Sequence, residues 1–276
     1  MTLPNFLILG ATRCGTSMLH HCLGFHPDIF MSDVKELQFF NRDTQFNEGI
    51  SHYSKSFEQA GGVKIRGEST PLYLEGGIYT ASGNYIDPLS DRSLKRINAV
   101  LPDSKFLISL RNPVKRAVSI FWKNYYQGKY GYTSFNEYFN TPANDSPTPD
   151  GFPHIIRRSD YALMLSNLFE VIPRDRCYVT IFEDWSKDIS SELHEILTFL
   201  EVDPTFHHEA WFEKQNTADR YRKNAQFGQL IAGAWQERRF KKEQTHAEQE
   251  VFEHLRDSIG KLELLLQRDL SIWQPR

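Results

Sequence analysis

The sequence predicts an α/β protein in which a central parallel sheet is flanked by helices. Short apolar runs of strand length alternate along the chain with longer segments of helical periodicity, and this order is typical of βαβ units. The chain has 276 residues, of which 40% are hydrophobic and 13% aromatic, so it can form a large core. Since no internal repeat or low-complexity tract is present, we expect a single domain that spans residues 1–276.

Apolar runs bounded by polar or turn residues predict strands at 5–9, 63–68, 105–110 and 177–182. Helical periodicity between them predicts helices at 16–25, 113–126, 159–171, 190–200, 225–239 and 245–268. The helix at 113–126 has the clearest start, because Asn112 is a favourable N-cap and Pro113 a favourable first helical residue. Segment 140–154 is rich in Pro, Asn, Asp and Ser and predicts a loop.

The charge balance argues against a polyanionic partner. Lys and Arg number 32 against 35 Asp and Glu, a net charge of −3, so no overall positive field would recruit nucleic acid or acidic lipid. The apolar run at the N-terminus is far shorter than the roughly 20 residues that cross a bilayer, so we expect no membrane segment. Only 3 cysteines are present, which fits a reducing compartment and a cytoplasmic chain.

The stretch GATRCGTS, residues 10–17, follows the first predicted strand. Its two glycines and final serine have the spacing of the phosphate-binding loop G-x-x-x-x-G-K-[ST], but Thr16 replaces the lysine. A strand, a glycine turn and a helix together direct backbone N–H groups and the positive end of the helix dipole toward one point, where an anion binds. Thr16 and Ser17 can donate hydroxyl hydrogen bonds, and Arg13 supplies a positive charge. Taken alone, the stretch is also compatible with a simple tight turn.

The stretch resembles the 5'-phosphosulfate-binding loop of sulfotransferases, G-x-x-[KR]-[SGTC]-G-T-[ST]-x-L, with Arg13 at the basic position. Sulfotransferases take their sulfuryl group from 3'-phosphoadenosine 5'-phosphosulfate, which has no γ-phosphate for a loop lysine to contact. The resemblance therefore implies a P-loop-like sulfotransferase fold, no metal ion, and a donor site at Arg13, Cys14, Gly15, Thr16 and Ser17.

A second stretch, residues 109–126, resembles the 3'-phosphate-binding segment of this family, R-[DN]-P-x-x-R-x-x-S. The resemblance places Arg111 and Ser119 at its two binding positions, where a guanidinium can grip a phosphate with two hydrogen bonds. Segment 213–226 is found where sulfotransferases close a loop on the nucleotide. Within it Arg220, Arg222 and Lys223 are candidates for the same phosphate, and a solvated charged loop explains them equally well.

Residues 32–43, SDVKELQFFNRD, resemble the [KE]-E-x-x-F-F segment of heparan-type carbohydrate sulfotransferases, in which the glutamate is the catalytic base. The resemblance makes Glu36 the candidate base, and a carboxylate beside the following apolar patch would be partly desolvated. The alternative is that Lys35 and Glu36 are solvated loop charges while Phe39 and Phe40 belong to the core.

Residues 66–74, RGESTPLYL, resemble a further family segment, [GV]-E-[KS]-[ST]-P-x-Y. Ser69 stands where the heparan-type enzymes often have lysine, so a cation near the transferred group is missing. Lys35 and Arg66 are the two candidates to replace it.

Together these motifs predict a metal-independent sulfotransferase that acts on an acceptor hydroxyl, with an amine as the less favoured alternative, with Glu36 as base and Arg13 offsetting the charge of the leaving phosphate. Carbohydrate is the acceptor class that the Glu36 segment indicates; lipid, peptide tyrosine and small alcohols stay open. The alternatives are a P-loop nucleotide kinase or NTPase, which the missing lysine and metal motif disfavour, and a non-catalytic nucleotide-binding module. A Golgi-lumen catalytic domain separated from its anchor is the alternative to the cytoplasmic location.

Overall fold

The computed structural model describes residues 1–76, 78–79, 85–86, 91–126, 134–140, 154–212 and 234–275. The chain forms two compact units, one made of Met1–Arg111 with Leu163–Gln215 and the other of Asn112–Ala162 with Asn216–Arg276. The first unit contains the sheet, and the second is helical.

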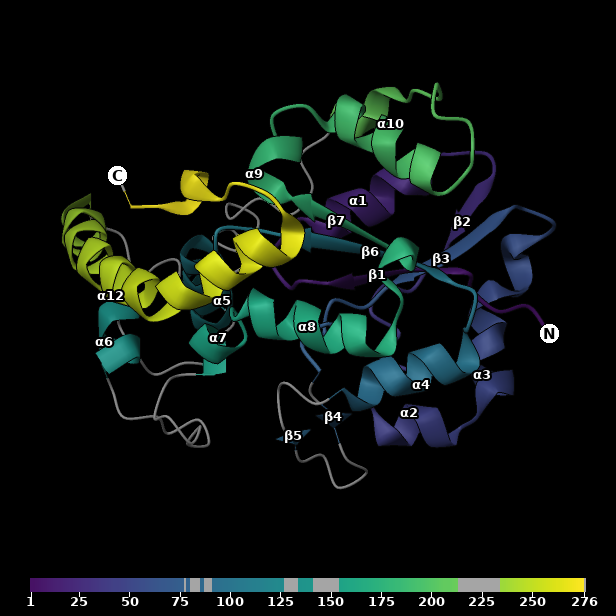
Figure 1. The fold of residues 1–276 in the computed structure, drawn as a ribbon, viewed down its shortest axis with the longest axis horizontal. Coiled ribbons are helices and arrows are strands. Elements are labelled where there is room, and N and C mark those ends of the chain that lie inside the picture. Colours follow the sequence, from purple (N-terminus) through teal and green to yellow (C-terminus); the bar gives the residue numbers. More distant parts are fainter. Residues whose placement is uncertain are drawn as a thin grey trace. The chain divides into compact units, whose positions relative to one another are not determined.

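The sheet of the first unit is parallel, with β1 buried at its centre (Figure 1). Phe6 of β1 lies opposite Gly67 on one side and Lys105 on the other. The strand order across the sheet is β2 (Ile29–Met31), β3 (Ile65–Ser69), β1 (Phe6–Gly10), β6 (Lys105–Leu110) and β7 (Cys177–Ile181). This arrangement confirms the predicted α/β class. A separate hairpin pairs β4 (Ile78–Tyr79) with β5 (Tyr85–Ile86).

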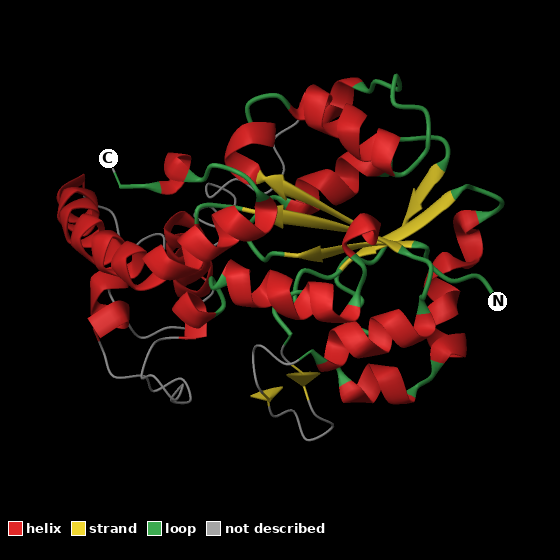
Figure 2. Ribbon diagram, in the orientation of Figure 1, coloured by secondary structure: helices red, strands yellow, loops and turns green. Residues whose placement is uncertain are grey.

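Helices cover both faces of this sheet (Figure 2). The helix α1 (Thr16–Leu23) and α10 (Ile189–Phe199) lie on one side, and α4 (Arg92–Val100) and α8 (Tyr161–Val171) on the other (Figure 1). On the α1 side, Leu19 and Leu193 pack with Phe6 in a buried core. The shorter helices of the unit are α2 (Asp43–Asn47), α3 (Ile50–Ser54), α9 (Phe182–Trp185) and the 3-10 turns η1 (Lys55–Ala60), η2 (Arg174–Arg176) and η3 (Glu209–Phe212).

The second unit is built around α5 (Pro113–Tyr126) and α12 (Ala234–Leu266), which contact each other and both contact α6 (Phe135–Asn140). It also contains α7 (His154–Arg157) and η4 (Ser271–Trp273). The Asn112 Oδ1 accepts a hydrogen bond from the Lys115 N–H at 3.1 Å, which confirms the predicted N-cap of α5. The Asn112 Nδ2 donates to the Trp273 carbonyl at 3.0 Å and so joins the start of α5 to the C-terminal turn.

The four predicted strands are confirmed, and 105–110 has the predicted bounds. The helices predicted at 16–25, 113–126, 159–171 and 190–200 are confirmed as α1, α5, α8 and α10. The predicted break between 239 and 245 is wrong, because α12 runs without interruption from Ala234 to Leu266. Residues 225–233 and 141–153 lie outside the described residues. Across the described ranges, no helix is both long enough and apolar enough to span a bilayer.

Candidate active site

The segments with candidate site residues follow the carboxyl ends of the strands. In a parallel sheet these ends share one edge, and ligands of open α/β sheets bind there, beside the strand at which the strand order reverses. Strand β1 has that position, since the chain continues from it to β2 and β3 on one side and later to β6 and β7 on the other. The segments in question are 11–15 after β1, 32–38 after β2, 70–75 after β3, Arg111 after β6 and 182–185 after β7.

The loop after β1 leads directly into α1. Gly15 is the N-cap of this helix, with a left-handed φ of 83°, and its carbonyl accepts from the N–H groups of Met18 at 2.9 Å and Leu19 at 3.2 Å. The N–H groups of Thr16 and Ser17 belong to the first helical turn, which offers them no intrahelical acceptor. Thr16 is buried and Ser17 is partly exposed. The arrangement is a helix N-terminus suited to bind an anion.

Neighbouring atoms approach both loop glycines too closely to leave room for a Cβ. A Cβ on Gly10 would lie 2.7 Å from the Leu74 Cβ and 3.0 Å from the Pro71 carbonyl. A Cβ on Gly15 would collide with the indole ring of Trp185, and the positive φ disfavours any other residue there as well. These contacts explain why positions 10 and 15 are glycine.

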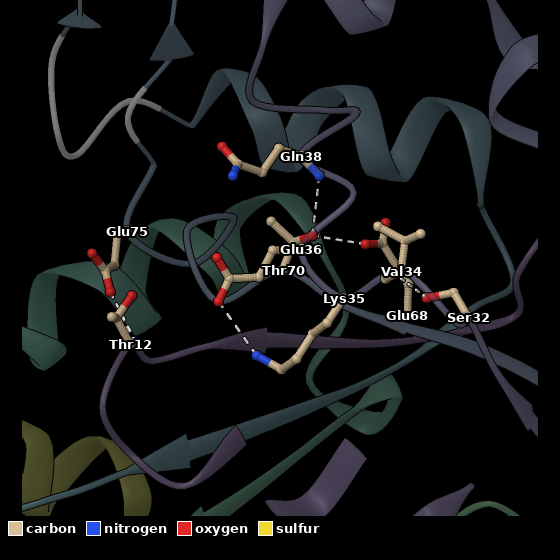
Figure 3. A network of polar contacts seen from close by, with 9 residues as sticks. All are labelled: Thr12, Ser32, Val34, Lys35, Glu36, Gln38, Glu68, Thr70 and Glu75. Carbon is tan, nitrogen blue, oxygen red and sulfur yellow. Dashed lines mark hydrogen bonds and ion pairs between the residues drawn. The ribbon is translucent and has the colours of Figure 1, made fainter. Parts of the chain in front are cut away.

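Three residues that were not predicted as site residues hold the loop in place. The Ser109 hydroxyl donates to the Cys14 carbonyl at 2.7 Å and accepts from the Trp185 Nε1 at 3.1 Å. Glu75, which is fully buried, accepts from the Thr12 N–H at 2.9 Å through its Oε1 (Figure 3). The sequence analysis missed these positioning residues. The signal that could have found Ser109 is its place two residues before Arg111 at the end of a strand.

Arg111 lies beside the loop. Its Nη1 donates to the Arg13 carbonyl at 3.3 Å, and its guanidinium carbon lies 4.7 Å from the centre of the Phe182 ring. Arg13 has a left-handed φ of 69°, and both arginine side chains are partly buried. The structure therefore brings together two of the predicted donor-binding arginines.

Other predicted donor residues have different surroundings. Cys14 is fully buried, and its N–H donates to the Ala11 carbonyl at 3.2 Å within the loop. Ser119 lies in α5, in the second unit. Arg222 and Lys223, together with Arg220, lie outside the described residues.

The backbone of Glu36, in the segment that follows β2, is fixed by a hydrogen bond. Its N–H donates to the Ser69 carbonyl at 3.0 Å, and its φ of 62° is in the left-handed region. Its carboxylate lies 3.4 Å from the Lys35 Nζ, and the Glu36 side chain is 43% exposed (Figure 3). Phe39 and Phe40 are buried in the core, with the Phe39 ring stacked on Tyr53 at 4.3 Å. The charged group beside the Glu36 carboxylate is therefore the Lys35 ammonium.

Of the two cations proposed to replace the lysine absent at Ser69, the structure favours Lys35. Burial lowers the pKa of Lys35, and the Glu36 carboxylate opposes that shift in part. Arg66 instead donates to the carbonyls of Leu3 at 2.9 Å and Val63 at 3.1 Å, and neither contact involves Glu36.

His20 lies on α1, one turn after Thr16, and is electrostatically coupled to Lys35. Burial and, to a smaller extent, the positive charge of Lys35 lower the pKa of His20 to about 4, against a raising contribution from a backbone hydrogen bond with Ser32. At neutral pH the imidazole is therefore uncharged. Within the described ranges, no group of three or more His, Cys, Asp or Glu side chains is arranged to hold a metal ion.

A glycine loop at a helix N-terminus, with two arginines at the carboxyl edge of a parallel sheet, defines an α/β protein of the nucleotide-binding or anion-binding class. The chain belongs to the sulfotransferase family, whose family model matches residues 4–208. The matched range includes the loop, Glu36, Arg111 and Ser119.

The curated relatives are larger proteins. The chain is 31% identical over 122 residues to the membrane-associated sulfotransferase kil1 of Dictyostelium discoideum, covering 43% of the chain and 22% of that protein. It is 30% identical over 116 residues to human heparan sulfate glucosamine 3-O-sulfotransferase 6, covering 42% of the chain and 29% of that protein. The chain therefore spans less than a third of the length of these relatives. A solved sulfotransferase from Alicyclobacillus acidocaldarius has the same fold over 100% of both chains, with a TM-score of 0.73 and 22% identity.

Proposed function

We propose that this chain transfers a sulfuryl group from 3'-phosphoadenosine 5'-phosphosulfate to an acceptor hydroxyl, as a single sulfotransferase domain. The observation that carries the proposal is the glycine loop of residues 10–17 with Arg13 and Arg111 beside it, in a chain of the sulfotransferase family. The loop has no lysine for a γ-phosphate, and the two arginines supply the positive charge.

The residues of the loop fit the 5' end of the donor. The N–H groups of Thr16 and Ser17 and the Ser17 hydroxyl bind the 5'-phosphosulfate, and Arg13 offsets the charge that develops on the leaving phosphate. Arg111 binds the 3'-phosphate, a group that ATP lacks, and so selects the donor. Cys14, Gly15, Ser119, Arg222 and Lys223 remain predicted donor-binding residues.

Glu36 acts as the general base in the proposed step. Its carboxylate takes the proton of the acceptor hydroxyl while the acceptor oxygen bonds to sulfur, and the bond between sulfur and the phosphate oxygen breaks. The Lys35 Nζ, 3.4 Å from the carboxylate, holds it in place. Lys35 also provides the cation that Ser69, which stands where the heparan-type enzymes often have lysine, does not. The step uses no metal ion.

The proposed acceptor is a carbohydrate hydroxyl. The hydroxyl is supported by the name of one relative, a heparan sulfate glucosamine 3-O-sulfotransferase. The carbohydrate class alone is supported by a second, a bifunctional heparan sulfate N-deacetylase/N-sulfotransferase from Drosophila melanogaster, 24% identical over 216 residues. The latter match covers 74% of the chain and 20% of that protein. We keep the cytoplasmic location as a prediction.

The donor site is tested by thermal stability with 3'-phosphoadenosine 5'-phosphate, compared with ATP plus magnesium at the same concentration. A ligand at a hundredfold excess over its Kd adds about 2.7 kcal/mol to the stability of the folded state, which raises the melting temperature by several degrees in a chain of this length. We expect stabilisation by the bisphosphate. Stabilisation by ATP with magnesium alone would replace the proposal with a nucleotide kinase or NTPase.

The base is tested by Glu36→Gln, which keeps the shape of the side chain and removes its basicity. We expect turnover to be lost and stabilisation by the bisphosphate to be retained. Wild-type turnover in this variant would exclude Glu36 as the base. Arg111→Ala is the complementary variant, because it should weaken bisphosphate binding above all.

A further inference from the structure

A second carboxylate, Glu68, lies behind the segment that carries Glu36. Glu68 is fully buried in β3 and accepts three hydrogen bonds from hydroxyl groups. Its Oε1 accepts from Tyr53 at 2.6 Å and from Tyr73 at 3.0 Å. Its Oε2 accepts from Thr70 at 2.7 Å (Figure 3). Burial raises the pKa of Glu68, and the three hydroxyl donors oppose that shift.

Every second residue of the segment 36–40 donates a backbone hydrogen bond to β3 or to the residues after it. The Glu36 N–H donates to the Ser69 carbonyl at 3.0 Å, the Gln38 N–H to the Thr70 Oγ1 at 3.3 Å, and the Phe40 N–H to the Tyr73 hydroxyl at 3.4 Å. Glu36 and Gln38 both have left-handed φ angles, 62° and 54°, which are unfavourable for residues other than glycine. This unfavourable backbone is therefore held by hydrogen bonds, of which two end on side-chain hydroxyls.

The direction of these hydrogen bonds makes Glu68 the residue on which the attachment depends. A backbone N–H can only donate, so the Thr70 and Tyr73 oxygens must accept from Gln38 and Phe40. Each hydroxyl has a single proton, which must then point to another acceptor. Glu68 accepts both protons, that of Thr70 at its Oε2 and that of Tyr73 at its Oε1.

We propose that Glu68 is a positioning residue for the catalytic base: by accepting the Thr70 and Tyr73 protons, it keeps both hydroxyls turned to receive the N–H groups of the segment that carries Glu36. This inference rests on the proposed role of Glu36. Glu68 itself touches neither donor nor acceptor and acts through the backbone of residues 36–40.

The principal test is Glu68→Gln. The glutamine amide has one acceptor oxygen and one donor nitrogen, so one hydroxyl must reverse its proton and oppose a backbone N–H. We expect faster amide hydrogen exchange at Gln38 and Phe40, and a kcat about 100-fold lower from displacement of the base. We expect the stabilisation by 3'-phosphoadenosine 5'-phosphate and the KM for the donor to stay at wild-type values.

A paired set of variants separates this role from a loss of folding. Thr70→Val removes the hydroxyl without changing its size, and Thr70→Ser restores it, so kcat should fall in the first and recover in the second. Tyr53→Phe is the matched control, because Tyr53 donates to the same Glu68 oxygen as Tyr73 but bonds to no N–H of residues 36–40. We expect it to keep wild-type kcat and wild-type exchange at Gln38 and Phe40.

Turnover is measured with radiolabelled donor and desulfated heparan sulfate as the acceptor. Wild-type exchange at Gln38 and Phe40 in both Glu68→Gln and Thr70→Val would overturn the inference, and so would equal losses of kcat in Tyr53→Phe and Thr70→Val. Failure of the proposed function has a different signature: the wild-type protein is then not stabilised by the bisphosphate and transfers no label. In that case the exchange measurement alone still decides whether Glu68 positions residues 36–40.

Discussion

The unfolding free energy should depend on pH through His20. In the folded protein burial lowers the pKa of His20 to about 4, whereas an imidazole in an unfolded chain has its model value of 6.5. Between these two values the unfolded state binds the proton and the folded state does not, so stability falls as the pH falls. The penalty is absent above pH 6.5 and complete below pH 4.

Applied to these two pKa values, the linkage relation gives a loss of about 2 kcal/mol between pH 7 and pH 5 from this group alone. The assay is urea unfolding of the wild-type protein and of His20→Gln at both pH values, so that the difference between the two losses isolates the titration of His20. His207→Gln, at an exposed position, is the control for the effect of the substitution itself. Equal losses in wild type and His20→Gln would show that His20 is protonated without penalty in the folded protein.

Two further substitutions probe the donor loop. Gly15→Ala should destabilise the protein by about 2–4 kcal/mol, because it combines a left-handed φ of 83° with a collision against the Trp185 ring, and urea unfolding measures the loss. A loss below about 1 kcal/mol would mean that the loop relaxes freely. Ser109→Ala should cost about 1–3 kcal/mol, since it leaves the buried Trp185 Nε1 without its acceptor and the Cys14 carbonyl without its donor. It should also weaken bisphosphate binding in a titration, and unchanged affinity would show that Ser109 does not hold the loop.

The sequence predicted the elements with a local signal. Strand 105–110 is a mostly apolar run, and Asn112 with Pro113 marks the start of the following helix, so both elements have the expected bounds. Strand β2 has only three residues, Ile29–Met31, too few for a periodic pattern to appear. The predicted break before residue 245 is wrong because a charged run at 238–242 resembles a helix boundary. In the structure, α12 continues through this run.

The candidate site residues differ in the same way, according to whether a local sequence signal is present. Gly10, Arg13, Gly15 and Glu36 belong to short motifs, and a motif is visible in one stretch of sequence. Ser109 reaches the loop from β6 and Glu75 from the turn after β3, at sequence separations of 95 and 63 residues, and nothing near the loop indicates them. Tyr53 likewise joins Glu68 from an earlier helix. Short motifs in the sequence therefore indicate candidate site residues, whereas the residues that hold them in place become visible only in the fold.

In the proposed mechanism, the order of strands keeps recognition of the donor apart from recognition of the acceptor. The donor loop follows β1 and the candidate base follows β2, with β3 between these two strands. Substitutions in residues 32–38 can therefore change which hydroxyl is presented to Glu36 while residues 10–17 remain as they are. In a family whose members share one sulfuryl donor, this separation allows acceptor preference to diverge at one place in the chain under independent selection.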